Sequence, residues 1–299
     1  MRILLLGKNG QVGWELQSTL APLGEVMAVD LPDVDFNNLK ALETFTREAT
    51  PDLIVNAAAY TAVDKAESEP DIAMRVNGEA PGLLAEIACG RGIGLVHFST
   101  DYVFDGSNSV PYTEEDPPNP LGVYGASKLA GDIAIQEAGC AYLILRTSWV
   151  YGARGRNFFL TMLRLARERE EIRVVEDQIG CPTWSRSIAM VTAQILKSRY
   201  QSEKDRIGWG EEIPSGVYNY SSSGSVSWYD FAEEILRTDP NRDEHVVQRL
   251  VPISTEAYGA EAARPSNSEL SMKKLKSVFG IPPEGWREQL RDCWDLHNK

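Results

Sequence analysis

Short apolar runs alternate with longer amphipathic stretches along the first half of the chain. The runs are continuously apolar, which is typical of strands buried on both faces of a parallel sheet. Strict alternation of strand and helix favours βαβ units with helices on both faces. The predicted strands are RILLLG, EVMAVD, DLIVNAAA, GLVHFST and AYLILRTSWV, and the predicted helices end near Leu23, span Asn38 to Ala49, run through Leu83 to Ala88, and span Tyr124 to Glu137.

The alternation becomes looser after residue 150. Helices are predicted at NFFLTMLRLARERE, Ile188 to Ser198, SWYDFAEEIL and WREQLRDCWDL, and strands at IRVVED, GVYNY and VVQRLVPI. The polar, glycine-rich stretch QSEKDRIGWGEEIPSG is expected to be a surface insertion. The pattern therefore predicts an α/β fold: a Rossmann-type, doubly wound parallel sheet over residues 1–150 and a smaller mixed α/β region over residues 151–299, some of whose segments return to the sheet.

The composition is that of an ordinary globular protein, with 43% hydrophobic and 24% charged residues among 299. The formal net charge is −13, and no block of lysine or arginine is present, so nucleic acid is not an expected partner. The opening MRILLLGKNG has too short an apolar run for a signal peptide or a membrane span. We therefore expect a cytoplasmic protein without a membrane partner.

Cysteine and histidine spacing gives no sign of a metal centre. The four cysteines and the three histidines are widely separated, so neither a disulfide framework nor a metal-ligand motif appears. We expect the cysteines to be packing or surface residues and no metal to be bound.

A glycine-rich turn follows the first predicted strand. GKNGQVG places Gly7, Gly10 and Gly13 between that strand and the first helix, where glycines permit a tight turn and close approach of backbone N–H groups to a pyrophosphate. Asp30 ends the second strand, where a carboxylate accepts hydrogen bonds from the adenosine ribose. The spacing differs from the commonest GxGxxG, but the strand-turn-helix context indicates a dinucleotide site. Asp30 disfavours a 2′-phosphate without excluding it, so both NADPH and NADH remain candidates.

Tyr124 and Lys128 are four residues apart in a predicted helix and therefore lie on one face. A nearby ammonium is expected to lower the pKa of the tyrosine toward the working range, and the same lysine can hold the nicotinamide ribose. Thr100 ends the strand GLVHFST, where its hydroxyl can donate to a substrate carbonyl beside Tyr124. Taken alone, the Tyr-Lys pair could equally be a solvated helix face.

The ordered stretches GKNGQVG, NAAAYTAVDKAE, FSTDYVFDG, YGASKLAGD, LRTSWVYG, DQIGCPT and RPSNSEL resemble the extended short-chain dehydrogenases/reductases, and within them the dTDP-4-dehydrorhamnose reductases. The resemblance covers almost the whole chain. It implies Thr100, Tyr124 and Lys128 as the catalytic set. The cofactor contacts that the glycine turn, Tyr124, Lys128 and the resemblance together imply are Gly7, Gly10, Gln11, Val12, Gly13, Asp30, Ala57, Ala58, Ala59, Ala62, Val63, Asp64, Tyr124 and Lys128.

The resemblance also implies a nucleotide-sugar substrate. It places Thr100, Asp101, Tyr102, Trp149 and Tyr151 around the sugar, although any one of the aromatic residues could instead belong to the core. Arg264 is expected to contact the pyrophosphate, since its planar fork matches phosphate oxygens; a surface salt bridge is the alternative.

Some family members are thought to dimerise through glutamates that hold a magnesium ion. Glu15 is present, but Arg186 and Arg287 stand where the partner carboxylates are expected, and arginine cannot ligate a cation. We therefore expect a monomer or a weak dimer.

The implied activity is reduction of the C4 ketone of dTDP-4-dehydro-L-rhamnose to dTDP-L-rhamnose, a polysaccharide precursor. Two alternatives stay open: another nucleotide-sugar reductase or epimerase with the same triad, and a non-catalytic NADP-binding subunit resembling the β subunit of methionine adenosyltransferase. The presence of Thr100, Tyr124 and Lys128 argues against the last.

Overall fold

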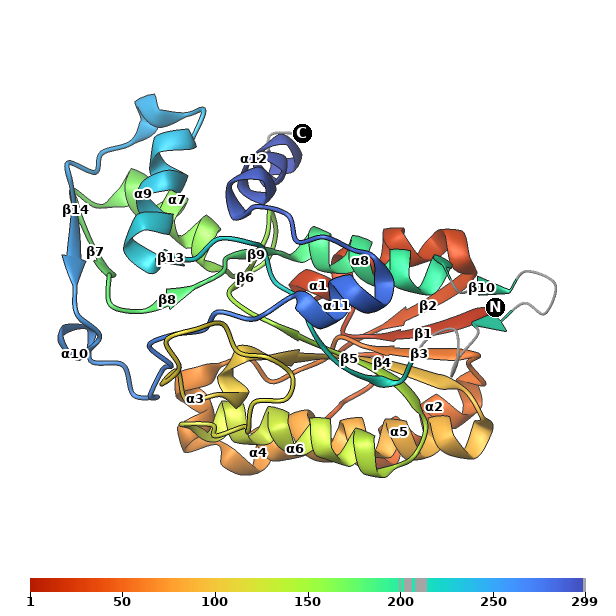
Figure 1. The fold of residues 1–299 in the computed structure, drawn as a ribbon. Coiled ribbons are helices and arrows are strands. Elements are labelled where there is room, and N and C mark those ends of the chain that lie inside the picture. Colours follow the sequence, from red (N-terminus) through yellow and green to blue (C-terminus); the bar gives the residue numbers. More distant parts are fainter. Residues whose placement is uncertain (199, 202–205, 208–213, 298–299) are drawn as a thin grey trace.

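A computed structural model describes residues 1–198, 200–201, 206–207 and 214–297 (Figure 1). Most of the predicted surface insertion at 201–216 lies outside the described residues. None of the helices in the described part of the chain combines the length and apolar character needed to cross a membrane.

A six-stranded parallel sheet forms the centre of the fold, with the strand order β12-β5-β4-β3-β1-β2. Its strands are β1 (Arg2–Leu6), β2 (Glu25–Val29), β3 (Leu53–Asn56), β4 (Gly94–Thr100), β5 (Ala141–Thr147) and β12 (Gly216–Asn219). The last of these comes from the second half of the chain and pairs with β5. The predicted α/β fold with a doubly wound parallel sheet is confirmed.

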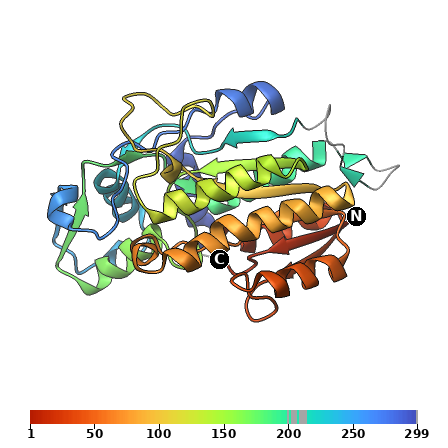
Figure 2. The ribbon, with the colours of Figure 1, turned by 90° about the horizontal axis from the view of Figure 1, so that it is seen from below.

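Successive side chains along β1 point to opposite faces of the sheet, as strand geometry requires. Ile3 and Leu5 pack in one apolar cluster and Leu4 and Leu6 in another, and all four are buried. The first cluster is covered by α1 (Gln11–Leu20), α8 (Ser185–Ser198) and α11 (Lys273–Phe279). The second is covered by α2 (Leu39–Ala49), α5 (Ala80–Arg91) and α6 (Val123–Glu137), which lie side by side in Figure 2.

A third apolar cluster, rich in aromatic residues, holds the second part of the molecule together (Figure 1, upper left). Its helices are α7 (Phe158–Glu168), α9 (Trp228–Thr238) and α12 (Trp286–His297), and its paired strands are β7 (Glu171–Val175) with β14 (Arg249–Ile253), β8 (Ile179–Gly180) with β13 (Val226–Ser227), and β6 (Val150–Tyr151) with β9 (Thr183–Trp184). The remaining elements are α3 (Val63–Ser68), α4 (Pro70–Met74), a π turn (Arg75–Glu79), α10 (Thr255–Tyr258), β10 (Tyr200–Gln201) with β11 (Arg206–Ile207), and 3₁₀ turns at Ala21–Leu23, Asp101–Val103 and Arg242–Glu244.

The glycine turn after β1 owes its shape to two of its three glycines. Gly7 has a φ of 87°, a conformation that side chains disfavour. A Cβ on Gly13 would lie 1.9 Å from the carbonyl oxygen of Gly7, so α1 packs against the turn only because that side chain is absent. A Cβ on Gly10 would meet its nearest atom at 3.4 Å, which is an ordinary contact.

This contrast predicts different outcomes for two alanine substitutions. Gly13→Ala should lower the free energy of unfolding by about 3 kcal/mol or prevent folding, because backbone must move to admit the methyl group. Gly10→Ala is the matched control and should change it by less than about 1 kcal/mol. Urea unfolding of the cofactor-free proteins measures both, and equal losses would show that the tight contact at Gly13 does not limit stability.

Candidate active site

The sequence-predicted residues collect at the carboxyl edge of the parallel sheet, where ligands bind in open α/β folds. Gly7 follows β1, Asp30 follows β2, and the alanines follow β3. Thr100 ends β4, and Trp149 comes shortly after β5. The parallel arrangement alone therefore brings segments separated by more than a hundred residues to one side of the molecule.

Asp30 supports the glycine turn through its carboxylate. One oxygen accepts a hydrogen bond from the backbone N–H of Asn9 (3.0 Å) and the other from that of Leu31 (2.8 Å). Gly10 is the N-cap of α1, and the first turn of that helix carries no acidic side chain. An anion at this helix end would therefore meet the N–H groups of the first turn and no carboxylate from that turn.

The first two residues of α1 connect the glycine turn to the rest of the fold. Gln11 donates from its amide to the carbonyl of Val150 (3.4 Å), and Val12 packs on the apolar cluster beneath α1. Gln11 and Val12, both predicted as cofactor contacts, thus lie at the end of α1 that borders the glycine turn.

The alanines after β3 form the opposite wall of the glycine turn. Ala57 donates its N–H to Leu6 (2.9 Å), and Ala58 donates its N–H to the side chain of Asn56 (3.1 Å). Ala58 is buried and Ala59 is half-buried. Farther along the chain, Ala62 is exposed and precedes α3, which begins at Val63.

Asp64 and Arg264, predicted as a cofactor contact and a substrate contact, are paired with each other. Two hydrogen bonds of 3.0 and 2.9 Å join one guanidinium nitrogen of Arg264 to both carboxylate oxygens of Asp64. Arg264 also donates to the carbonyl of Ala262 (3.1 Å). Burial alone would raise the pKa of Asp64, but the hydrogen bonds from Arg264 and Ala262 hold it below its ordinary value. The guanidinium of Arg264, which the sequence predicts as a pyrophosphate contact, is thus already hydrogen-bonded to Asp64 and Ala262.

Thr100, Asp101 and Tyr102 form a tight turn at the end of β4. The Thr100 hydroxyl accepts from the backbone N–H of Tyr102 (3.2 Å) and donates to Asp101 (3.1 Å). Asp101 is buried, and this burial raises the pKa of its carboxyl group to about 6, although the hydrogen bond from Thr100 opposes the rise. An acid that changes charge near pH 6 lies directly beside Thr100.

Helix α6 packs unusually close to this turn. A Cβ on Gly125 would lie 2.2 Å from the carbonyl oxygen of Tyr102, so glycine lets the helix touch the turn. The carboxylate of Glu67 accepts from the backbone N–H of Val123 (2.8 Å) and caps the first turn of α6. As a result the rings of Tyr102 and Tyr124 meet edge to face, with 5.4 Å between centroids.

The environment of Tyr124 contradicts one expectation from the sequence. Burial raises the pKa of Tyr124 to about 12; a hydrogen bond with Thr100 lowers it and the charge of Asp101 raises it further. The expected lowering by Lys128 was wrong for the free protein, because loss of hydration outweighs any attraction from the lysine. Tyr124 is therefore a phenol at neutral pH.

Lys128 is one of the most deeply buried polar residues, with 2% of its surface exposed. Its Nζ donates to the carbonyl of Phe98 (2.6 Å) and lies 3.1 Å from Nε2 of His97. Burial lowers the pKa of Lys128 to about 8, against the attraction of Asp132. The solvated helix face that the sequence left open as an alternative is excluded for this residue.

His97 and Asn56 were not predicted as site residues. His97 was treated as one of three scattered histidines, yet it is fully buried against Lys128. A signal was present in the sequence: a titratable residue interrupts the otherwise apolar run GLVHF of a buried parallel strand, where a polar side chain needs a partner.

The two predicted aromatic sugar contacts after β5 lie largely inside the protein. Trp149, with a φ of 48°, is 9% exposed and stacks on Trp228 at 3.5 Å between ring centroids. Tyr151 is 1% exposed and packs on Phe231 in the aromatic cluster. We withdraw Tyr151 as a substrate contact, because its side chain offers no surface to a ligand; Trp149 stays a prediction.

Glu15 is buried next to a cation of the same chain. Its carboxylate lies 3.4 Å from the guanidinium of Arg186. Burial raises the pKa of Glu15, and Arg186 and Arg154 oppose the rise. Arg287 lies elsewhere, 3.9 Å from Glu234.

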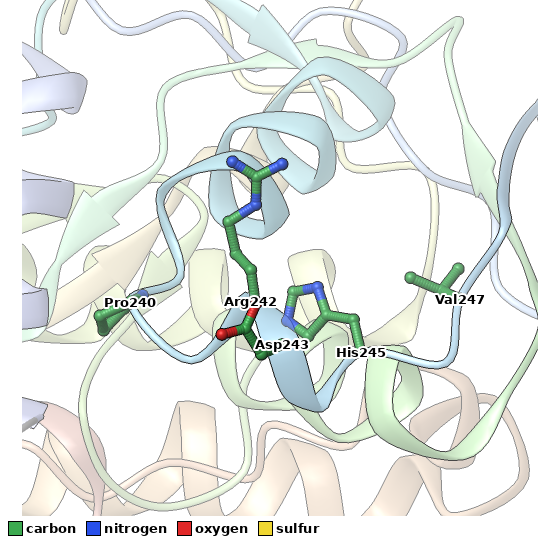
Figure 3. A pocket seen from close by; sticks show the side chains of 5 residues that line it. All are labelled: Pro240, Arg242, Asp243, His245 and Val247. Carbon is green, nitrogen blue, oxygen red and sulfur yellow. The ribbon is translucent and has the colours of Figure 1, made fainter.

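A hollow of about 570 Å³ is lined by the segment that joins α9 to β14 along the chain (Figure 3). It is lined by Pro240, Arg242, Asp243, His245 and Val247, none of which is a predicted site residue. Nε2 of His245 is already 2.8 Å from Asp239. We therefore place the chemistry at the sheet edge and not in this hollow.

Comparison with known proteins identifies the family of this chain. The family model described as the RmlD substrate binding domain matches residues 1–298. The chain belongs to the RmlD substrate-binding-domain family. The resemblance to dTDP-4-dehydrorhamnose reductases found in the sequence is thereby confirmed at the level of the family.

Curated relatives match this chain over almost its whole length. A dTDP-4-dehydrorhamnose reductase of Burkholderia thailandensis is 48% identical over 296 residues, covering 98% of both chains. The enzyme of the same name from Escherichia coli K12 is 42% identical over 292 residues, covering 96% of this chain and 95% of that one. Among solved structures, dTDP-4-dehydrorhamnose reductase from Bacillus anthracis in complex with NADP superposes with a TM-score of 0.88 at 35% identity, covering 99% of each chain.

The pKa of Asp101 predicts an unusual effect of pH on stability. Its folded-state value of about 6 exceeds the ordinary 3.8, so the folded protein binds the extra proton between these values. Stability contributed by this group is present below about pH 4 and is lost as the pH rises to about 6, by up to about 3 kcal/mol. Asp101→Asn should remove this loss, so its stability relative to the unsubstituted protein should rise between pH 4 and pH 6.

Asp105 in the same loop provides a matched control of opposite sign. Hydrogen bonds from Ser107, Asn119 and Tyr112 lower its pKa, so its contribution is present above about pH 4 and is lost in acid. Asp105→Asn should therefore become less stable than the parent as the pH rises through 4. Urea unfolding across pH 3 to 8 measures the free energy of unfolding of both variants relative to the parent. The same pH dependence in Asp101→Asn and Asp105→Asn would refute the raised pKa of Asp101.

Proposed function

We propose that this chain is an NADPH- or NADH-dependent reductase of a nucleotide sugar, acting on the C4 ketone of dTDP-4-dehydro-L-rhamnose to give dTDP-L-rhamnose. The observation that carries the proposal is the convergence of Thr100, Tyr124 and Lys128 at the carboxyl edge of the sheet, beside the glycine turn. Relatives that match over almost their whole length are dTDP-4-dehydrorhamnose reductases, which suggests the substrate.

The residues present fit a dinucleotide. The turn shaped by Gly7 and Gly13 leaves backbone N–H groups at the start of α1 for the pyrophosphate, and no acidic side chain opposes it. The Asp30 carboxylate stands where the adenosine ribose is held in this fold. The related B. anthracis structure contains NADP. When bound, the nicotinamide supplies the hydride.

Tyr124 is the proton donor in this proposal. Because burial holds its pKa at about 12, the phenol is protonated at neutral pH and ready to donate to the developing alkoxide. The Thr100 hydroxyl is the second donor in this proposal; it donates to Asp101 in the resting structure and has to turn from that carboxylate toward the carbonyl oxygen when substrate binds. Lys128 positions the nicotinamide ribose.

Both parts of the chain contribute to the substrate site in this proposal. Residues 1–150 carry the cofactor site and also the substrate contacts Asp101, Tyr102 and Trp149, and residues 151–299, the main substrate region, contribute Arg264. Asp64 then serves to hold Arg264 in place through its two hydrogen bonds. Arg264 reaches a diphosphate if the ligand shares the guanidinium with Asp64.

Charge and ion pairing support the remaining assignments of partner and location. The net charge of −13 disfavours nucleic acid, and we place the protein in the cytoplasm, where sugar nucleotides are made. Arg186 already neutralises Glu15, which supports a monomer or a weak dimer without a bridging metal ion.

The test is the fall in reduced-nicotinamide absorbance with dTDP-4-dehydro-L-rhamnose, run in parallel with NADPH and NADH. Tyr124→Phe should lower kcat by about 10²- to 10⁴-fold while leaving cofactor affinity unchanged, because only the transferred proton is lost. Tyr142→Phe is the control: Tyr142 lies at the amino end of β5, away from the carboxyl edge of the sheet, so this variant should keep the kcat of the parent. Full activity of Tyr124→Phe would contradict the role of Tyr124 as proton donor. No oxidation of either cofactor would contradict the proposed substrate.

A further inference from the structure

A small cluster of charged side chains lies where the glycine turn meets the end of β2. The backbone N–H of Lys8 donates to the carbonyl of Val29 (3.2 Å), so Lys8 leaves the turn directly beside that strand end. Its ammonium donates to a carboxylate oxygen of Asp33 (2.6 Å). The carboxylate of Asp30, the predicted ribose contact, accepts from the backbone N–H of Asn9 in the same turn (3.0 Å). Neither Lys8 nor Asp33 was predicted from the sequence as a site residue.

A tight turn after β2 brings Asp33 back to Asp30. The backbone N–H groups of Asp33 and Val34 both donate to the carbonyl of Asp30, at 2.6 and 3.2 Å. The carboxylate of Asp33 in turn accepts from the backbone N–H of Asp30 (3.4 Å), through the same oxygen that meets Lys8. The turn therefore places a second carboxylate and one ammonium beside the carboxylate that is assigned to the adenosine ribose.

The charges of this cluster follow from its hydrogen bonds. The hydrogen bond from Lys8 lowers the pKa of Asp33 below its ordinary value, and the hydrogen bond from the backbone of Asp30 acts in the same direction. Asp33 is therefore a carboxylate at neutral pH. Two carboxylates and one ammonium leave the cluster with a net charge of −1.

We propose that Asp33 sets the preference between the two nicotinamide cofactors: it holds Lys8 away from the 2′-phosphate of NADPH and adds a second negative charge beside Asp30, so that the protein binds NADH more tightly than NADPH. The inference rests on the proposed function and narrows its cofactor, because NADPH and NADH differ only in this phosphate. Asp33 is thus a specificity-determining residue without a catalytic role.

Lys8 on its own would favour the opposite cofactor, since a lysine ammonium is a point charge that attracts phosphate. The phosphate gains this cation only if Lys8 leaves Asp33, and the carboxylate of Asp33 then faces the phosphate without its counter-ion. The side chains of Lys8 and Asp33 are 31% and 40% exposed, so water screens the pair and the exchange is not forbidden. NADPH binding is therefore weakened and not excluded.

The 2′-hydroxyl of NADH makes no such demand on the cluster. The two carboxylate oxygens of Asp30 each accept from one backbone N–H, of Asn9 and of Leu31, and a carboxylate has further lone pairs for a ribose hydroxyl. Lys8 stays with Asp33 in this case. The contacts of the resting protein are thus compatible with NADH as they stand.

The loop after β2 contacts a further cation. The guanidinium of Arg75 donates to the side chain of Asn37 (3.1 Å), four residues past Asp33. The carboxylate of Asp35 lies between them along the chain and accepts from the backbone N–H of Asn37 (2.9 Å). A neutral amide does not cancel the charge of Arg75, so this arginine is the rival candidate for a 2′-phosphate contact.

The test is the binding of NADH and NADPH to the intact chain in the absence of sugar, followed by fluorescence titration. The parent should bind NADH more tightly. Asp33→Asn keeps the size of the side chain and removes the charge that holds Lys8, so the affinity for NADPH should rise at least about tenfold while that for NADH changes by less than about twofold. The gain should shrink with added salt, which screens exposed charges. An unchanged ratio of the two affinities, or a parent that prefers NADPH, would overturn the inference.

Two lysine substitutions separate the role of Lys8 from a general effect of charge. Lys8→Met, introduced together with Asp33→Asn, should remove most of the gain in NADPH affinity. A gain that survives in this double variant would assign the phosphate to Arg75 or to lost repulsion alone, and would overturn the inference. Lys40→Met removes an exposed lysine from the first turn of α2 and is the control, which should leave the ratio of affinities within about twofold of the parent.

Because no sugar is present, these titrations are independent of the proposed reaction. The expected shift in Asp33→Asn, together with no reduction of dTDP-4-dehydro-L-rhamnose, would support the inference and count only against the proposed substrate. Binding of neither cofactor by the parent would contradict the proposed cofactor site and overturn the inference with it. Both side chains of the pair are partly exposed, so its loss costs little stability and the variants should fold.

Discussion

The parallel register of β3 and β4 is the constraint on which the site depends. It sets Asn56 directly opposite His97, so the two side chains emerge side by side on one face of the sheet. Helix α6 covers that face and inserts Lys128 between itself and β4. The same register carries β4 on to Thr100 at the edge of the sheet. A shift of one residue would turn Asn56 and His97 to opposite faces and leave Nδ1 of His97 buried without its contact to Asn56.

Burial, more than pairwise attraction, determines the protonation of the groups at this edge. It is the largest influence on the pKa of Asp101, Tyr124 and Lys128, and in each case it favours the neutral form. The close packing of α6 on the turn after β4, which glycine at position 125 permits, keeps water away from all three. At neutral pH, nevertheless, a pKa of about 6 leaves Asp101 a carboxylate and a pKa of about 8 leaves Lys128 an ammonium, while Tyr124 stays an uncharged phenol.

Much of the fold could be predicted from the pattern of apolar residues. The strand predicted at GLVHFST is β4, and the helix predicted from Tyr124 to Glu137 is α6, one residue longer. Each prediction needed only local periodicity and the rule that ligands lie at the carboxyl ends of parallel strands. The pKa of Tyr124 and the interior position of Tyr151 could not be predicted, because both depend on how deeply distant segments bury a side chain. The contacts of His97 lie between these cases. The sequence shows a histidine that interrupts an apolar strand, but its partners Asn56 and Lys128 are 41 and 31 residues away along the chain.

The second half of the chain also belongs to the central sheet and its covering helices. It contributes β12 to the sheet and α8 and α11 to one of its faces. The Arg264–Asp64 pair then ties the segment after α10 to α3 at the mouth of the proposed cofactor site. Because the chain passes between the two parts several times, a ligand that displaces Arg264 from Asp64 acts on both parts at once. Under the proposed assignment of Arg264 to the substrate, binding would be coupled to the position of α3 through this one ion pair. The Asp64 carboxylate is half exposed, so it can exchange the guanidinium for water without the penalty of a buried charge.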